Sequence, residues 1–282
     1  TDDKQNLNYP DNFIVKYTTL EELKEFFQSK FDFKISLSGV YKLGDYKPLY
    51  GYLFEDLIKD YDAWGYLDVP DEICGDVSEF VNEEAFKDAD KLMTRGHMTI
   101  FKNTPEINRR FMANTGESFN YRDIFSSEHF FNFEEIARGS ISWIYVNNKW
   151  NMNLLNDAVA DVSGLFYDFR RSCISEKLEY YRPSKAPSIY AREDGKVYGY
   201  FLEKGQVVKR EYLYLHFKRR KMQINIPFEA DKYLIVPSGF ETYKEVTADV
   251  IKHYAKKKWF YPVFWEEVKK SIVRKFTKNN GR

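Results

Sequence analysis

The chain has 282 residues, which suits one large domain or two small ones and is enough to bury a sizeable core. Its 43 Lys and Arg residues balance 43 Asp and Glu residues, and this zero net charge argues against a nucleic-acid-binding protein, which would carry a basic excess. The two cysteines, Cys74 and Cys173, are too few for a disulfide framework and favour a reducing compartment, and no apolar run is long enough to span a bilayer.

The first half of the chain alternates between predicted helices and short strands. Thr19 and Glu22 form a capping box, which predicts that a helix begins at residue 20. Further along, Pro70 ends the apolar, aromatic run of residues 63–69. Helices are expected over 20–31, 51–61, 77–89 and 105–114, and strands over 63–69 and 97–103. A helix followed by a short buried strand and an acidic loop is typical of an α/β fold.

The second half is richer in strand patterns. Residues 188–202 and 206–217 alternate between apolar and polar side chains, and Asp194-Gly195 within the first run predicts a hairpin turn. Pro and Gly do not cluster into a linker, so we expect one domain over residues 1–250.

Residues 251–282 differ in composition and are expected to form a basic, aromatic helical tail. Between Lys252 and Arg282 there are ten Lys or Arg residues and two Glu residues, interleaved with aromatic side chains. This pattern suits peripheral contact of 252–282 with an anionic membrane surface. A solvated helix that packs its aromatic side chains on the body of the protein would show the same pattern.

The acidic stretch WGYLDVPDEICGD, residues 64–76, is the first candidate site. Asp68 and Asp71 follow a predicted strand, and ligands of open α/β sheets gather at the carboxyl ends of strands. A divalent cation of the Mg²⁺ or Mn²⁺ type prefers such oxygen ligands and keeps positions open for phosphate. A solvated acidic turn would have the same sequence.

Other polar residues strengthen the interpretation of this stretch as a site. His216 lies at the end of an alternating strand and could complete a metal shell as a neutral imidazole. The basic run 218–221 follows it and could neutralise a diphosphate. Upstream, Lys47 follows a predicted turn, and Gly96-His97 precedes a predicted strand. Each has an ordinary alternative, a core or surface histidine or a solvated basic face.

The order and spacing of these motifs resemble a family of bacterial glycosyltransferase-like proteins from polysaccharide and lipopolysaccharide gene clusters. Its motifs are T-D-D, D-F-K-P-x-x-G, W-G-x-x-D-x-D-x-x-x-G-D, G-H, N-T-x-x-x-N and H-x-Q-K-R-x-M. The matching residues are Thr1-Asp2-Asp3, Asp45-Tyr46-Lys47-Pro48 with Gly51, Trp64-Gly65 with Gly75-Asp76, Gly96-His97, Asn103-Thr104 with Asn108, and His216 with Arg220 and Met222. Each motif is weak by itself, and their order over most of the chain is fairly specific.

The resemblance implies a GT-A-like fold, a nucleotide-sugar-binding α/β sheet flanked by helices, with a C-terminal β-hairpin region and the basic helical tail. It implies a Mn²⁺ or Mg²⁺ cofactor under the diphosphate of the donor. The metal ligands would be Asp68, Asp71 and His216, and the nucleotide-binding residues would be Asp2, Asp3, Asp45, Lys47, Arg219, Arg220 and Lys221. His97 and Trp143 are expected to contact the acceptor, because an aromatic ring such as Trp143 can stack on a sugar, although packing in the core would be an ordinary use of the same side chain.

Three features depart from the family pattern. The acidic motif is D-V-P-D, one residue longer than D-x-D, and Pro70 restricts itself and Val69, so either Asp71 alone takes the metal or the loop bulges. Family members also have a further strand before T-D-D, and we expect that this strand is missing from the given sequence. Lys218 and Arg219 replace the usual Gln and Lys and keep or add positive charge.

The function implied by the resemblance is transfer of a hexose from a nucleotide sugar, by analogy a UDP-sugar, to a cell-surface glycan or lipid-linked acceptor. An inverting reaction needs a carboxylate to deprotonate the acceptor hydroxyl, and Glu134, Glu135 and Asp161 are the candidates. A retaining reaction needs no such base, and the three acids would also suit a solvated surface. The expected location is the cytoplasm, at the inner face of the cytoplasmic membrane.

Two other classes of function remain open from the sequence. A non-catalytic glycan- or nucleotide-binding module of degenerate glycosyltransferase fold would explain the D-V-P-D spacing. A nucleic-acid-binding protein would use the 218–221 run and the tail and would bind with strong salt dependence, and the zero net charge argues against it.

Overall fold

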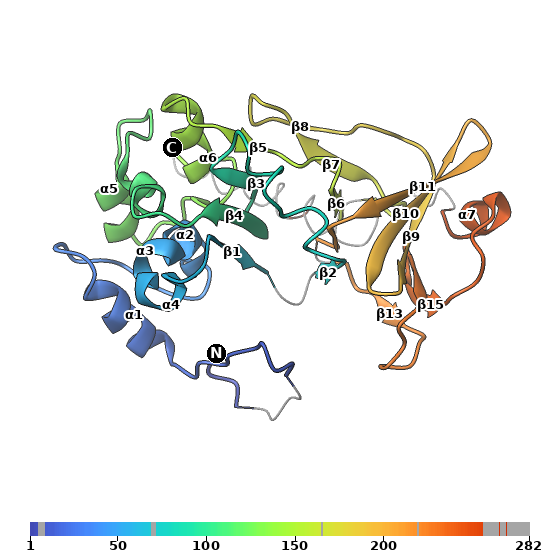
Figure 1. Cartoon of the computed structure of the whole chain (residues 1–282), viewed down its shortest axis with the longest axis horizontal. Helices are drawn as coiled ribbons and strands as arrows, with labels where there is room; N and C mark the ends of the chain where they lie inside the picture. The colour runs from blue at the N-terminus through green and yellow to red at the C-terminus, as the bar shows by residue number, and fades with distance from the viewer. Residues whose placement is uncertain are drawn as a thin grey trace. The chain divides into compact units, whose positions relative to one another are not determined.

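The structure is a computed structural model that describes residues 1–4, 9–68, 72–164, 166–218, 220–255, 265 and 269 (Figure 1). The described residues form a mixed α/β protein with three sheets and short helices, which confirms the predicted α/β class. Packing divides the chain into two compact units, each made of two segments. Unit 1 contains Thr1–Leu67 and Phe86–Asn153, and unit 2 contains Asp68–Ala85 and Leu154–Arg282.

Unit 1 is built on a sheet with the strand order β1-β4-β3-β5, in which only the β3–β5 pair is parallel. Its strands are β1 (Ala63–Leu67), β3 (Lys91–Arg95), β4 (Met98–Lys102) and β5 (Met152–Asn153). Its helices are α1 (Leu20–Gln28), α2 (Leu43–Tyr46), η1 (Lys47–Leu49), α3 (Tyr50–Leu53), α4 (Glu55–Ile58), η2 (Ile107–Met112), α5 (Tyr121–Ser126) and α6 (Ile141–Asn147). The predicted capping box is confirmed, because Thr19 and Glu22 exchange side-chain and backbone hydrogen bonds at the start of α1.

Three of the predicted helices differ from the structure. Residues 77–89 form turns, and the prediction of a helix there is wrong. The Asp76 carboxylate accepts from the backbone N–H of Ser78, and the Asn82 side chain accepts from that of Ala85, so local side-chain bonds replace the helical ladder. The helix predicted over 51–61 is divided between α3 and α4, and the one over 105–114 is the 3₁₀ helix η2.

Unit 2 contains two sheets. The six-stranded sheet has the order β11-β10-β9-β14-β15-β13, and the five-stranded sheet has the order β2-β12-β6-β7-β8. The first is formed by β9 (Ser188–Glu193), β10 (Lys196–Glu203), β11 (Gln206–Tyr212), β13 (Gln223–Ile224), β14 (Tyr233–Val236) and β15 (Gly239–Thr242). The second is formed by β2 (Glu72–Cys74), β6 (Val159–Val162), β7 (Arg171–Ile174), β8 (Tyr180–Tyr181) and β12 (Tyr214–His216).

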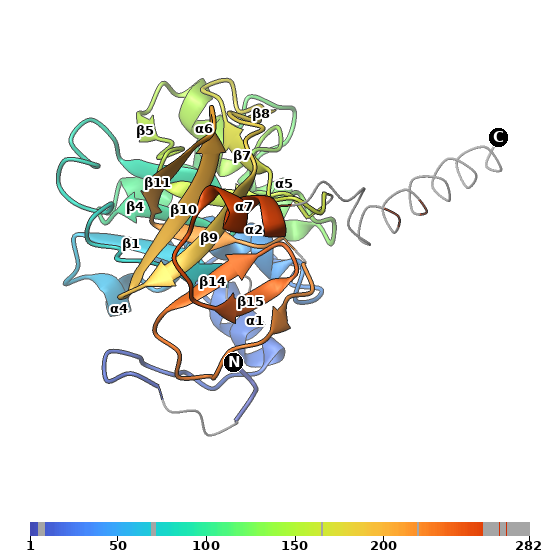
Figure 2. The same ribbon diagram turned by 90° about the vertical axis from the view of Figure 1, so that its right-hand side faces the viewer.

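The predicted hairpin in unit 2 is confirmed. Glu193 of β9 pairs with Lys196 of β10 across Asp194-Gly195, and both turn residues have positive φ, as a tight hairpin turn requires. The helix α7 (Ala248–Tyr254) packs against β9 and β10 (Figure 2). Ile251 of this helix belongs to the same apolar cluster as Ile189 of β9.

The other face of the six-stranded sheet packs on the five-stranded sheet through a second apolar cluster. That cluster contains Tyr190 and Tyr212 from one sheet and Ala160, Val162 and Leu215 from the other. Because side chains alternate along a strand, the residues between these core positions face the opposite side of the five-stranded sheet. This alternation decides where the polar residues of β6 and β12 lie.

Several predictions fall outside the described residues. Asp71, Arg219 and nearly all of the tail 251–282 belong to this group, apart from 251–255, Trp265 and Lys269. The division expected at residue 250 and the membrane contact of the tail therefore stay predictions. In the part of the chain that the structure describes, no helix is long and apolar enough to cross a bilayer.

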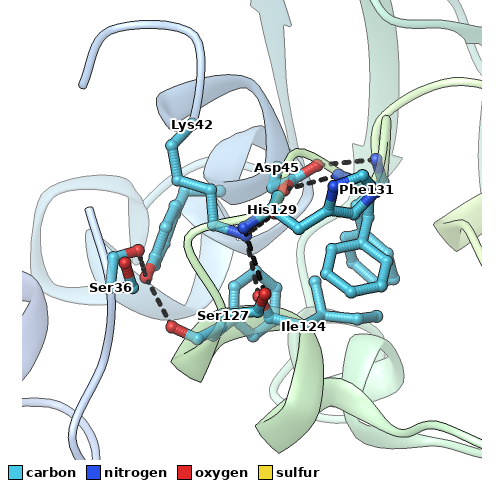
Figure 3. A network of polar contacts seen from close by, with 10 residues as sticks. Ser36, Lys42, Asp45, Ile124, Ser127, His129 and Phe131 are labelled. Atoms are coloured by element: carbon cyan, nitrogen blue, oxygen red, sulfur yellow. Dashed lines mark hydrogen bonds and ion pairs between the residues drawn. The ribbon is translucent and has the colours of Figure 1, made fainter. Parts of the chain in front are cut away.

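A buried ion pair connects distant segments of unit 1 (Figure 3). The Lys42 ammonium, 2% exposed, lies 2.9 Å from the Asp45 carboxylate, which is fully buried. Lys42 also donates to the carbonyls of Ile124 and His129, and Asp45 accepts from the backbone N–H groups of Phe131 and Phe133. The pair therefore fixes the backbone that leads into residues 134 and 135.

We expect Asp45→Asn to lower the free energy of unfolding by about 3–5 kcal/mol, because it leaves the Lys42 charge buried without its partner. The amide nitrogen also cannot accept the backbone N–H groups that the carboxylate oxygens accept. Urea unfolding measures the change. The control is Asp32→Asn, which removes an exposed pair with Arg122 and should cost no more than about 1 kcal/mol. Equal losses for the two variants would contradict the stabilising role of the buried pair.

Candidate functional site

Glu134 and Glu135 lie in unit 1, between α5 and α6, where two glycines approach them closely. A Cβ at Gly44 would lie 2.8 Å from Oε1 of Glu134, and a Cβ at Gly96 would lie 2.7 Å from Oε1 of Glu135. Neither position can carry a side chain without displacing the acids. The segment before the D-Y-K-P motif and the Gly96-His97 turn therefore meet at this acidic pair.

Lys47 and Tyr66 belong to the same cluster in unit 1. The Lys47 ammonium donates to the carbonyl of Gly96 over 3.0 Å and lies 5.8 Å from the centre of the Tyr66 ring. The Tyr66 hydroxyl donates to the carbonyl of Glu134 over 3.4 Å. The cluster thus combines a cation, two acids and an aromatic ring from three segments.

Glu134 has the electrostatic properties of a proton acceptor. Burial raises its pKa to about 7, the negative charges of Glu135 and Asp45 raise it too, and Lys47 opposes the shift. Its side chain is 6% exposed, and within the described part of the chain its Oε2 atom has no hydrogen-bond partner. A carboxyl group whose pKa lies near neutrality can accept and return a proton at physiological pH.

The two residues expected to contact the acceptor lie in unit 1. His97 is buried in the turn between β3 and β4, next to the glycine that approaches Glu135. Trp143 is half-buried on α6, and its indole N–H donates to the carbonyl of Ile136 over 2.9 Å. The ring of Trp143 carries the exposed Arg138 guanidinium 5.8 Å from its centre.

Some motif residues hold the fold of unit 1. The Trp64 indole N–H donates to the side chain of Asn108, whose amide donates to Asn103. Asn103 in turn donates to the carbonyls of Ile58 and Tyr61. A Cβ at Gly51 would lie 2.3 Å from the Trp64 ring, so this glycine lets α3 approach β1. These motif matches are therefore explained by packing.

In unit 2, Asp161 of β6 and His216 of β12 are partners in a parallel pair of strands. Asp161 is fully buried and His216 is 7% exposed. A carboxylate oxygen of Asp161 and a ring nitrogen of His216 lie within 4.8 Å of each other. Both point away from the apolar cluster of unit 2, because their strand neighbours fill that cluster.

The basic residues after His216 have different roles in the structure. The Lys218 ammonium lies 2.9 Å from Oδ2 of Asp161. Arg220 is buried and donates to the carbonyls of Ser163, Phe166, Tyr167, Asp168 and Pro237. Lys221 is exposed, and Arg219 lies outside the described residues. Arg220 thus organises a loop beside β6.

The acidic loop leads directly into the strand beside His216. Asp68 is half-buried and follows β1, and Asp71, outside the described residues, precedes β2. The backbone of Glu72, the first residue of β2, is the register partner of His216. The strand that begins directly after D-V-P-D in the sequence therefore pairs with the strand that carries His216.

The remaining predicted nucleotide-binding residues lie elsewhere in unit 1. Asp2 and Asp3 are exposed near the N-terminus, where the backbone N–H of Asp3 donates to the Thr1 hydroxyl. Asp45 is the buried partner of Lys42 described above. Its carboxylate oxygens are engaged with Lys42 and two backbone N–H groups. Nucleotide binding by these three residues stays a prediction.

Residues 1–244 match the family described as "Family of unknown function (DUF6625)". The chain belongs to this family. The DUF6625 match spans all the motifs from Thr1 to Met222, in both units. No curated protein and no solved structure matches the chain. Because the description names no activity, the roles of these residues must be argued from their own chemistry.

Sequence reasoning did not select several residues that surround the candidate acids. Gly44 and Tyr66 lie against Glu134, and the ion pair of Lys218 with Asp161 was not predicted, although Lys218 belongs to the predicted basic run. Side chains alternate between the two faces of a strand, so Asp161 and His216 can be predicted to share a face once β6 and β12 are known to pair. No local pattern indicates that Gly44 and Gly96 approach the same two glutamates.

Glu134→Gln tests the raised pKa of this carboxyl group. Between about pH 4.5 and 7 the folded chain binds more protons at Glu134 than the unfolded chain, so this group lowers the free energy of unfolding as the pH rises. Glu134→Gln has no carboxyl group to ionise, so its free energy of unfolding does not fall for this reason. Its free energy of unfolding, relative to the wild type, should therefore rise by up to about 3 kcal/mol across that window, as measured by urea unfolding.

The control for this exchange is Glu128→Gln, at an exposed position on the same segment of unit 1. It reports the effect of replacing a carboxyl by an amide where no burial is involved. A stability difference between Glu134→Gln and the wild type that stays constant from pH 4.5 to pH 7, within about 0.5 kcal/mol, would contradict the raised pKa.

Proposed function

We propose that the chain is a metal-assisted glycosyltransferase that moves a hexose from a nucleotide sugar, by analogy a UDP-sugar, to a cell-surface glycan acceptor. The observation that carries the proposal is the arrangement around His216. Asp161 lies beside it on β6, and the acidic loop 68–71 leads into β2 on its other side. In this proposal, carboxylate oxygens from β6 and from the acidic stretch before β2 join the imidazole of His216 as metal ligands.

The residues around His216 fit a divalent cation. The ring nitrogen of His216 and a carboxylate oxygen of Asp161 lie within 4.8 Å of each other, so these two residues would hold the cation. Carboxylate ligands suit Mn²⁺ and Mg²⁺, and the phosphate oxygens of the donor would supply further oxygen ligands. Asp68 and Asp71 are the further oxygen ligands in this proposal. When bound, the cation would supply positive charge that stabilises the departing diphosphate.

The chain's own groups account for the other requirements of the reaction. The acceptor oxygen forms a bond to the anomeric carbon while the bond from that carbon to the diphosphate breaks. In an inverting transfer, Glu134 would take the proton of the acceptor hydroxyl, because its pKa of about 7 allows it to ionise at neutral pH. The Lys218 ammonium would face the negative charge that develops on the leaving group.

Glu134 is a better candidate for the base than the other two acids. Asp161 already bonds to Lys218 and lies beside His216, which favours a role at the cation. Glu135 is half-buried next to Glu134 and helps to raise its pKa. A GT-A-like fold, a nucleotide pocket that involves Lys47, and an acceptor site at His97 and Trp143 are parts of the same proposal.

Calorimetric titration of UDP with and without Mn²⁺ tests the proposal. Mn²⁺ should tighten UDP binding by at least about tenfold, because a cation held by these residues would add positive charge beside the diphosphate. His216→Gln and Asp71→Ala should each remove most of this gain. His253→Gln, an exposed histidine on α7, is the matched control and should leave it unchanged.

UDP binding that is independent of Mn²⁺, His216 and Asp71 would overturn the metal-assisted mechanism. In that case, a UDP-sugar that binds and is never turned over would favour the non-catalytic module of degenerate glycosyltransferase fold. Strong, salt-dependent binding of DNA or RNA would instead favour the nucleic-acid class.

A further inference from the structure

A small cavity lies at the edge of the five-stranded sheet in unit 2. It has a volume of about 300 Å³ and is lined by Ser172, Tyr180, Tyr181 and Arg182. The two tyrosines belong to the edge strand β8 and are 52% and 46% exposed. A cavity of this size with exposed aromatic rings suits one sugar ring, since tyrosine combines an apolar face with a polar hydroxyl.

Arg182 gives this cavity a positive charge. Among the residues that the structure describes, Arg182 forms no ion pair with a carboxylate, and its guanidinium stacks 4.6 Å from the centre of the Phe166 ring. Arg170 stacks on the same ring at 3.8 Å, and Asp168 balances its charge over 2.9 Å. The Arg182 guanidinium therefore lies at the rim of the cavity, and no carboxylate among the described residues balances its charge.

The loop that carries Phe166 is held in place by the buried Arg220. Arg220 donates to the carbonyls of Phe166, Tyr167 and Asp168. A Cβ at Gly164 would lie 2.3 Å from the carbonyl oxygen of Lys218, so this loop packs closely on the segment after β12. Preorganised donors lose less entropy when a ligand binds, which favours recognition of a defined anion.

The cavity adjoins the residues of the proposed cation site in unit 2. Ser172 is the register partner of Asp161, which is the partner of His216, so the three lie on one face of the sheet. Lys218 bonds to Asp161 and lies 5.2 Å from the centre of the Tyr180 ring. One lysine therefore contacts both the proposed cation ligand and the wall of the cavity.

We propose that the Ser172–Tyr180–Tyr181–Arg182 cavity binds a uronic acid residue of the acceptor glycan. This inference rests on the proposed transfer to a glycan. The sugar ring stacks on a tyrosine, and the Arg182 guanidinium makes a bidentate contact with the carboxylate. The cavity would then select acidic over neutral acceptors beside the cation site.

The test measures binding of a galacturonic acid trisaccharide and of its fully methyl-esterified form to the full chain, by calorimetry in EDTA without nucleotide. The two probes have the same rings and differ only in charge. We expect the acid to bind at least about tenfold more tightly than the ester. Because neither metal nor UDP is present, failure here is distinguishable from failure of the metal-assisted mechanism.

Two variants separate the contributions of charge and stacking. Arg182→Gln should weaken binding of the acid about tenfold and leave the ester unchanged. Tyr181→Ala should weaken both probes, because stacking does not depend on the carboxylate. Arg210→Gln is the matched control, since Arg210 is also an exposed arginine of unit 2 beside an aromatic ring, Phe201, and should change neither affinity.

Any of three results would overturn the proposal. Equal affinity for the acid and the ester would show that the cavity does not select for the charge of the carboxylate. Equal losses for Arg182→Gln and Arg210→Gln indicate attraction by surface charge in general. Binding of inorganic phosphate that depends on Arg182, without binding of the uronate, assigns the cavity to a phosphate group.

Discussion

The candidate chemistry of unit 2 depends on the alternation of side chains along β6 and β12. Ala160 and Val162 on β6 and Leu215 on β12 fill the space between the two sheets, and burial of these side chains holds the sheets together. Asp161 and His216 are therefore forced to the other face, where parallel pairing makes them neighbours. A shift of either strand by one residue would exchange core and polar positions at once, so the register that stabilises the fold also places the two polar groups.

In unit 1, packing keeps the Glu134 carboxyl group buried next to a second acid, Glu135. The backbone around residues 131–133 is fixed by the Lys42–Asp45 pair, and Gly44 and Gly96 leave room for the two glutamates. The same burial that raises the pKa of Glu134 to about 7 costs stability when the group ionises. A site of this kind is expected where a protein needs a proton acceptor near neutral pH.

The basic run 218–221 illustrates how neighbouring residues of one charge acquire different roles. Lys218 bonds to Asp161, Arg220 holds a loop through backbone carbonyls, and Lys221 is exposed. The loop that Arg220 organises carries Phe166, which supports Arg182 at the edge of the sheet. A sequence motif that looks like a single phosphate clamp thus connects a candidate cation site with a separate cavity.

The sequence by itself determined local features whose cause is local. The capping box of α1, the hairpin at Asp194-Gly195 and the mixed α/β class follow from hydrogen bonds and side-chain periods within a few residues. The prediction of a helix over 77–89 was wrong because the side chains of Asp76 and Asn82 accept backbone N–H groups there. The spacing of apolar residues does not take these competing hydrogen bonds into account. Only the tertiary structure decided that Gly44 and Gly96 meet at Glu134 and Glu135, and that Ser172, Asp161 and His216 share a face. These contacts join residues far apart in the chain, and they are set by packing and strand register, which local sequence patterns do not encode.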